Sequence, residues 1–185
     1  GELFVPHLLD AIEEGKNGSD ARAALIYADD AAAFDEVVTR LTGWKARGYQ
    51  ARSGVATFYD APTATDREDA IATMIFNAWF GPSISKVFDD EGVPQIIGAL
   101  GGEGRIALLL KLLNGRGAGN SQALGSFNVA TNESVYFDVL GTEAVESSRE
   151  VMLIALADAL AFLESPSTKP GEGGFGTADM TTWLW

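Results

Sequence analysis

The stretch TDREDAIATMIFNAWFGPSISKVF, residues 65–88, indicates the fold class more clearly than any other part of the chain. Apolar side chains recur in it at intervals of three and four residues, which is the spacing of one face of an α-helix. These side chains are Ile71, Met74, Ile75, Ala78 and Trp79, followed by Ile84, Val87 and Phe88. We expect the helix to begin at Thr65 or Asp66, because Thr65 and Glu68 have the spacing of a capping box. Pro82 is expected to kink or restart it.

Helical spacing also recurs on both sides of this stretch. We expect helices over residues 3–14, 21–41 and 105–113, and from Ser147 or Ser148 to residue 163. Asp29 or Asp30 could start a new helix inside the second of these, because Asp is a good N-cap residue. Residues 45–62 and 127–137 lack the helical spacing and suggest irregular structure or short strands. The sequence therefore predicts a mainly α fold, an irregular helical domain with one or two short β or extended segments.

The chain divides by composition into two parts. Residues 1–164 are expected to form the helical segment, and residues 165–185 a tail rich in glycine and proline. Residues 165–177 of this tail should be a flexible connection. Four large aromatic side chains are expected in the core because they bury much apolar surface, namely Trp44, Trp79, Tyr136 and Trp183.

Composition and charge exclude several classes of function. The 185 residues are 46% hydrophobic and 21% charged, as expected for a globular domain with a core. The net charge of −13 repels phosphate backbones, which argues against nucleic-acid binding. Cysteine is absent, so thiolate metal sites and disulfides are excluded. No apolar run approaches the roughly 20 residues of a membrane span, and no signal peptide is visible at the start.

Ser83-Ile84-Ser85-Lys86 matches the Ser-x-x-Lys pattern of penicillin-binding proteins and serine β-lactamases. In those enzymes the lysine, one helical turn after the serine, helps to activate it. Ser126-Phe127-Asn128 supplies a Ser-x-Asn element, but Lys169-Pro170-Gly171 stands where Lys-Thr-Gly is required on a strand. The proline would remove a ladder hydrogen bond from that strand, so a serine acyl enzyme centred on Ser83 is the weaker hypothesis.

Three other motifs have simpler explanations. Gly115-Arg116-Gly117-Ala118-Gly119 lacks the Gly-Lys-Ser/Thr ending of a phosphate-binding loop. Asp89-Asp90-Glu91 would face different directions on a helix, whereas calcium requires six to eight converging oxygens. His7 lies beside an apolar stripe, where packing is the expected role. We therefore assign no catalytic, cofactor-binding or metal-binding residue in this chain.

Short segments that carry apolar anchors follow one another along the chain at residues 4–11, 38–44, 72–79, 136–138, 148–157 and 183–185. Their order resembles the large (β) chain of the penicillin acylase (penicillin amidase) family. Each match is short, and together they cover nearly the whole chain. Val38-Thr39-Arg40-Leu41-Thr42-Gly43-Trp44 resembles the helix that ends in the family's L-x-x-W-(D)-G signature, although Lys45-Ala46 replaces Asp-Gly. The other segments that resemble the family are residues 4–11, 72–79, 136–138, 148–157 and 183–185.

The resemblance implies a parent enzyme that hydrolyses linear amides between an acyl group and an amine, a type of hydrolase linked to antibiotic biosynthesis. Family members are N-terminal-nucleophile hydrolases with an αββα core, whose nucleophile is the first residue of the β chain after autoproteolysis. Gly1-Glu2 cannot be that nucleophile, and the catalytic residues are expected before this segment in family order. The parent is expected to be periplasmic or extracellular, and any calcium to be bound outside this segment.

We therefore expect an internal helical segment that is structural and inactive alone. Its partners would be the remainder of the parent, namely the α chain and the β-chain core, and the parent's substrate would be a small-molecule amide. Neither nucleic acid nor a membrane span is expected. An independent helical binding module is the main alternative, and it would need an exposed apolar groove.

Overall fold

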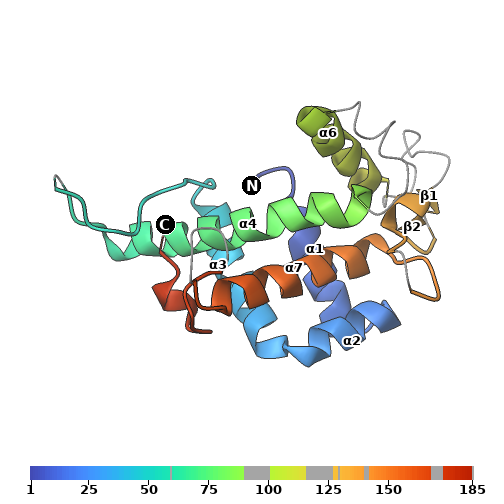
Figure 1. The fold of residues 1–185 in the computed structure, drawn as a ribbon, viewed down its shortest axis with the longest axis horizontal. Coiled ribbons are helices and arrows are strands. Elements are labelled where there is room, and N and C mark those ends of the chain that lie inside the picture. The colour runs from blue at the N-terminus through green and yellow to red at the C-terminus, as the bar shows by residue number, and fades with distance from the viewer. Residues whose placement is uncertain are drawn as a thin grey trace.

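The computed structural model describes residues 1–58, 60–89, 101–115, 127–128, 130–139, 142–167 and 173–184. These residues form six α-helices, two short strands and two 3-10 helices, which confirms the predicted mainly α fold (Figure 1). In chain order the elements are α1 (Val5–Asn17), α2 (Ala21–Asp29), α3 (Ala31–Ala46), α4 (Ala64–Phe88), α6 (Gly101–Asn114), β1 (Phe127–Asn128), β2 (Glu133–Ser134), η1 (Val135–Phe137), α7 (Ser148–Glu164) and η2 (Met180–Thr182).

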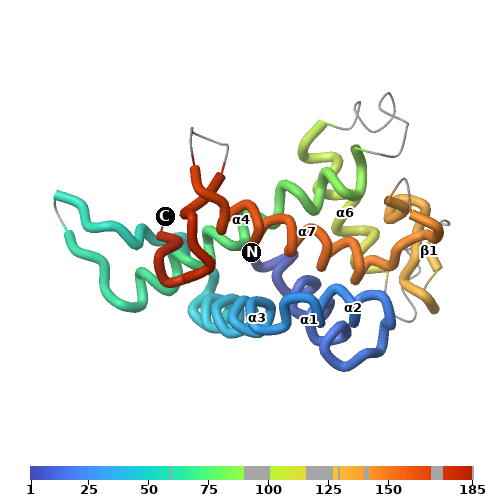
Figure 2. Tube along the Cα trace, turned by 60° about the horizontal axis from the view of Figure 1, so that its bottom comes forward, coloured from blue at the N-terminus to red at the C-terminus, as the bar shows by residue number. Residues whose placement is uncertain are grey.

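The two long helices α4 and α7 pack against each other at the centre of the molecule, and α1 packs against α7 (Figures 1 and 2). Trp79 of α4 is fully buried between them, and its indole N–H donates to the carbonyl of Met152 on α7 at 3.1 Å. Trp44, Trp79 and Trp183 are buried as predicted, whereas Tyr136 is only half-buried. The core is therefore built from helices that are far apart in the sequence.

Helix α4 begins earlier than predicted. Its N-cap is Thr63, whose hydroxyl accepts from the Asp66 N–H at 3.1 Å, and the Asp66 carboxylate accepts from the Thr63 N–H at 3.0 Å. The prediction of Thr65 and Glu68 was therefore wrong by two residues, because two overlapping pairs had the spacing of a capping box. The helix does not restart at Pro82 but continues to Phe88. Gly81 before the proline has no Cβ, which reduces the usual clash with the proline ring.

The predicted helix over residues 21–41 is two helices that meet at Asp30. The Asp30 carboxylate accepts from the Ala33 N–H at 3.4 Å and begins α3, which confirms the predicted start of a new helix. Helix α3 then runs past Leu41 to Ala46, so the expected change at Lys45 comes slightly too early. Trp44 explains the extension, because it packs in this last turn against Tyr49 and Phe76.

Two regions outside the long helices agree with the prediction of short β or irregular pieces. Strands β1 and β2 pair antiparallel, with Phe127 opposite Ser134. Residues 47–62, which we call the arm, connect α3 to α4 with no strand in the described residues (Figure 1).

Helix α6 starts at Gly101, before the predicted Arg105, and buries one face through Leu109, Leu112 and Leu113.

The predicted flexible connection over residues 165–177 is packed against α7 where it is described. The Phe175 N–H donates to the carbonyl of Leu163 at 2.6 Å, and a Cβ on Gly174 would collide with that same oxygen. Only glycine fits so close an approach. Met180 and Trp183 are buried, and the Trp183 indole donates to the carbonyl of Thr177 at 3.0 Å. The end of the chain thus contributes to the core.

Candidate functional site

Ser83, the serine of the Ser-x-x-Lys pattern, lies inside the molecule. Its exposed fraction is 0%, and its hydroxyl donates to the backbone carbonyl of Phe80 at 2.8 Å. The Lys86 ammonium pairs with Asp158 on α7 at 2.9 Å. A nucleophilic serine has to meet the substrate and pass its proton to a nearby base. The observed contacts direct the hydroxyl and the ammonium to other partners and give no support to acyl transfer at Ser83.

Of the remaining elements of that pattern, the structure describes only Asn128. Asn128 is at the end of β1, while Ser126 and residues 169–171 lie outside the described residues. Gly115 follows α6 directly, and the rest of the glycine run lies outside the described part as well.

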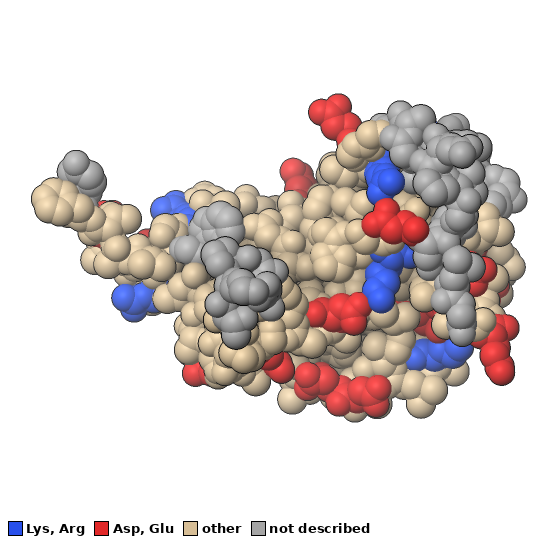
Figure 3. Space-filling model, in the orientation of Figure 1, with Lys and Arg blue, Asp and Glu red and all other residues tan. Residues whose placement is uncertain are grey.

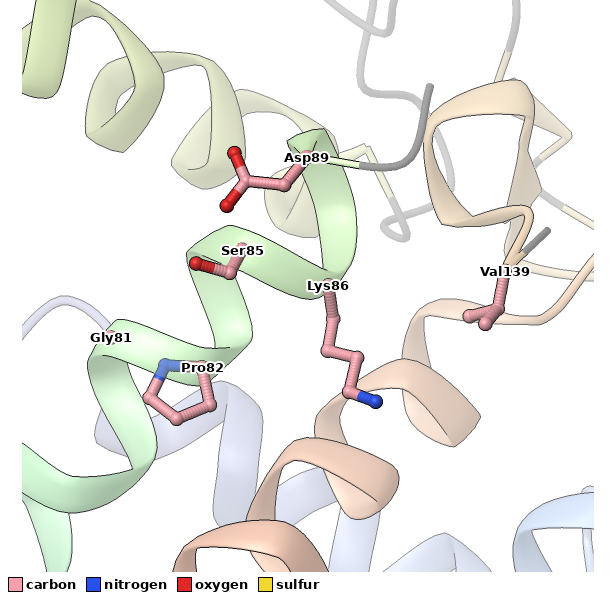
Figure 4. A pocket seen from close by; sticks show the side chains of 6 residues that line it. All are labelled: Gly81, Pro82, Ser85, Lys86, Asp89 and Val139. Atoms are coloured by element: carbon pink, nitrogen blue, oxygen red, sulfur yellow. The ribbon is translucent and has the colours of Figure 1, made fainter. Parts of the chain in front are cut away.

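A hollow of about 690 Å³ lies beside the second half of α4 (Figure 4). Its lining residues are Gly81, Pro82, Ser85, Lys86, Asp89 and Val139. Figure 4 shows Ser85 and Asp89 on one side of α4, with Lys86 extending toward α7. The Asp89 carboxylate pairs with Arg105 at 2.7 Å, as Lys86 does with Asp158. The hollow can take an apolar group, but the ionisable side chains on its rim are engaged in ion pairs.

The most extensive polar cluster surrounds the start of α7. The Ser147 hydroxyl donates to Asp20 at 2.6 Å, and the other oxygen of Asp20 accepts from the Arg22 and Ala23 N–H groups at 3.1 Å, which caps α2. The Glu150 carboxylate accepts from the Ser147 N–H at 2.7 Å and pairs with Arg22 at 2.8 Å. One serine therefore caps α7 and also holds it to the cap of α2.

Burial raises the pKa of Glu150 above its usual range, and the negative charges of Asp20 and Glu146 act in the same direction. The Ser147 N–H and Arg22 oppose this rise, because they stabilise the ionised carboxylate. Glu146 is itself buried and accepts from the Val139 N–H at 2.7 Å. A raised carboxyl pKa in a cleft can indicate a general acid, but Glu150 is only 4% exposed.

Arg149 extends the cluster toward α1. Its guanidinium pairs with Glu14 and lies against the side-chain amide of Asn132. Burial lowers the pKa of Arg149, and Asp10 partly offsets this effect. The Ser148 N–H donates to the Asn132 carbonyl at 2.9 Å. These contacts join α1, α2, the β2 region and α7, so the cluster acts as a structural clamp, not as a substrate site.

The sequence predicted only part of this cluster. Ser147 and Glu150 form a capping box at the predicted start of the last helix, whereas the role of Asp20 as the N-cap of α2 was not predicted. No local signal linked Ser147 to Asp20, since 127 residues separate them. Arg22 and Arg149 were missed for the same reason.

The structure also bears on metals and membranes. Within the described residues, no three His, Asp or Glu side chains are grouped as metal ligands would be. Asp90 and Glu91 of the acidic trio lie outside these residues. His7 is half-buried on α1.

Among the helices described, none has the length and apolarity needed to span a membrane.

Acidic side chains are spread over the lower edge of the face shown in Figure 3. With 26 acidic and 13 basic residues in the chain, this face repels polyanions.

Comparisons with models of protein families, with curated proteins and with solved structures found no match to this chain.

Proposed function

We propose that this chain is a helical, structural segment of a penicillin-acylase-like amidohydrolase, and that catalysis occurs elsewhere in the parent enzyme. The parent would hydrolyse a linear amide, releasing an acyl group from an amine, and would act in the periplasm or outside the cell. The α chain and the β-chain core would be the partners of this segment. Any calcium in the parent would be held by those partners.

The observation that supports this proposal most strongly is the mutual packing of the segments that resemble the family. Phe4 of α1 lies 4.9 Å between ring centres from Phe80, which directly follows the segment 72–79, and Trp44 of α3 lies 5.7 Å from Phe76. Trp79 donates to Met152 of α7, and Trp183 is buried. Anchors that matched the family only in sequence order therefore meet in one core, as parts of a single architecture would.

The polar clusters support a structural role for this segment. The buried hydroxyl of Ser83 donates to a backbone carbonyl, and the ionisable groups around α7 form ion pairs or accept backbone N–H groups. Such contacts hold helices together without presenting a nucleophile to a substrate.

The test is to read the gene on both sides of the 185 codons in the source DNA. The proposal predicts an upstream autoproteolytic junction with serine, threonine or cysteine after it, followed in frame by this segment. A frame with no such junction would contradict the proposal.

A second candidate, an independent binding module, is favoured by one observation, the hollow beside Pro82 and Val139. Its apolar floor could take an aromatic or aliphatic group. Nuclear magnetic resonance screening of the isolated chain with small aromatic acids tests this candidate. It predicts shifts at Gly81, Ser85 and Val139, and their absence would remove it.

A further inference from the structure

The chain contains two Asn-Gly pairs, Asn17-Gly18 and Asn114-Gly115, and each stands at the C-terminal end of a helix. In such a pair the backbone nitrogen of the glycine can attack the side-chain carbonyl carbon of the asparagine, because glycine has no Cβ to obstruct the approach. The structure places the two pairs in different surroundings, and their reactivity should differ accordingly.

Asn17 and Gly18 lie in an open turn between α1 and α2, at the edge of the molecule (Figure 2). Both are exposed, and a Cβ on Gly18 would meet nothing within 4 Å. The Gly18 N–H donates to the Gly15 carbonyl at 3.2 Å, and the N–H of the exposed Ser19 donates to the Glu14 carbonyl at 3.2 Å. The Gly18 nitrogen can therefore be freed by opening two long hydrogen bonds at the end of α1, which is a local event.

Asn114 ends α6, and the glycine that follows it is buried. A Cβ on Gly115 would lie 3.2 Å from the ring of Phe127 and 3.1 Å from the Leu112 carbonyl oxygen. The Gly115 N–H donates to the Lys111 carbonyl at 3.0 Å and to the Leu112 carbonyl at 3.2 Å. Freeing this nitrogen requires the end of α6 to separate from β1, which is a larger and rarer opening.

We propose that Asn17 is a site of spontaneous deamidation in the folded protein, that Asn114 is protected, and that conversion of Asn17 loosens the junction of α1 and α2. The Gly18 nitrogen forms a bond to Cγ of Asn17, the bond from Cγ to Nδ2 breaks, and the amide proton of Gly18 leaves with Nδ2 as ammonia. Water then opens the cyclic imide to aspartate or isoaspartate. The reaction consumes only water, and the inference does not depend on the proposed function.

The conversion changes the charges at the end of α1. The Nδ2 of Asn17 donates to the Glu13 carboxylate at 2.9 Å, so the reaction replaces a hydrogen-bond donor with a second negative charge. Like charges one helical turn apart repel each other, and a negative charge at the C-terminus of a helix opposes the helix dipole. Lys16, the basic residue of this last turn, is already paired with Asp35 at 2.7 Å. The product should therefore weaken the end of α1.

The isoaspartate product also lengthens the main chain of the turn by a methylene group. Only residues 18–20 separate α1 from α2. The Asp20 carboxylate caps α2 and accepts from the Ser147 hydroxyl of the clamp. A longer main chain just before Asp20 is expected to disturb these contacts, so the modification would reach the attachment of α2 to α7.

The test follows both asparagines in the same molecule. The chain is incubated at mildly alkaline pH, native or in urea, and is then digested with trypsin. Cleavage after Lys16 and Arg22 releases residues 17–22, and cleavage after Lys111 and Arg116 releases residues 112–116. Each peptide contains a single asparagine, so mass spectrometry measures the two conversions separately. A sample digested without incubation gives the conversion that the digestion itself causes.

The ratio of the two rates in urea corrects for the different neighbouring residues in the sequence. After this correction we expect Asn17 to convert at least about tenfold faster than Asn114 in the native chain, because only Gly18 is freed by a local opening. A smaller ratio would overturn the inference. So would a native chain in which Asn17 does not convert while the chain in urea converts at both positions.

Two variants test the consequence for stability. Asn17→Asp carries the charge of the product, and Asn17→Gln, the matched control, keeps a neutral amide. We expect Asn17→Asp to lower the melting temperature relative to Asn17→Gln at neutral pH, and the difference to shrink as salt screens the charges. Equal melting temperatures of the two variants at low salt would overturn the predicted loosening of the junction.

Discussion

Trp79 on α4 and Phe58 in the arm are large aromatic side chains with opposite exposure. Trp79 is fully buried, packs near Phe76 and donates its N–H to α7, while Phe58 is 94% exposed on a turn closed by Thr57 and Asp60. The difference separates two roles within one chain. Trp79 stabilises the segment itself, whereas Phe58 leaves almost all of its side chain exposed and is expected to contribute little to that stability.

The largest effect is expected at Trp79. Trp79→Ala should lower the free energy of unfolding by about 3–5 kcal/mol, since it leaves a cavity between α4 and α7 and removes the hydrogen bond from the indole to the Met152 carbonyl. Urea denaturation followed by circular dichroism measures it. Trp79→Phe is the matched control and should cost less, because it keeps most of the packing. A loss below about 1 kcal/mol for Trp79→Ala, well under the range for large core side chains, would show that the α4–α7 contact is not the centre of the core.

The next effect concerns the clamp at the start of α7. Ser147→Ala removes both the cap of α7 and the hydrogen bond to Asp20, so a loss of about 1–2 kcal/mol is expected in the same denaturation experiment. Thr63→Ala is the control, because Thr63 caps α4 in the same way but its side chain bonds only within its own capping box. Equal losses for the two variants would mean that the link to Asp20 adds no stability.

A pH-dependent difference is expected at Glu150. The pKa of Glu150 is raised on folding, so its contribution to stability is present below about pH 4.5, its ordinary pKa, and is lost as the pH rises through the raised value. Glu150→Gln keeps an acceptor for the Ser147 N–H but cannot ionise. The wild type should therefore lose stability relative to this variant as the pH increases from about 4.5. Parallel stability curves from about pH 4 to about pH 8 would disprove a raised pKa.

The smallest effect is expected at Phe58. Phe58→Ala should change the free energy of unfolding of the isolated chain by less than about 0.5 kcal/mol, as for other exposed positions. Thermal denaturation of the two proteins side by side is sufficient. A decrease comparable to that of Trp79→Ala would mean that Phe58 packs within the segment, and the contrast between the two aromatics would disappear.

The start of a helix was predicted correctly where the apolar stripe and the N-terminal capping pattern indicate the same residue. Helix α7 begins after Ser147 because a capping box and an apolar stripe coincide there. Helix α4 was misplaced by two residues because Thr63-x-x-Asp66 and Thr65-x-x-Glu68 overlap, and the local pattern does not decide between them.

The burial of Ser83 could also have been read from spacing. Ser83 lies four residues after Trp79 and four before Val87, so it continues their buried face. A serine at this spacing is expected to be buried with Trp79 and Val87, even where it also matches a Ser-x-x-Lys pattern.

Other features could not be predicted, since they depend on contacts between distant parts of the chain. The link from Ser147 to Asp20 joins two regions at opposite ends of the sequence. The projection of the arm depends on the packing of Gly54 against Ala70 and Leu184. The composition of residues 165–177 indicated a flexible connection, whereas the close packing of Gly174 against the Leu163 backbone holds part of this stretch against α7.

The most direct test of the structural role is an assay of amide hydrolysis on the isolated 185-residue chain and on the complete parent, with a chromogenic phenylacetyl amide as substrate. We predict turnover by the matured parent and none by the isolated chain. A fluorescent β-lactam added to the isolated chain should leave Ser83 unmodified. Turnover by the isolated chain, or covalent labelling of Ser83, would contradict the account and place the active site within this segment.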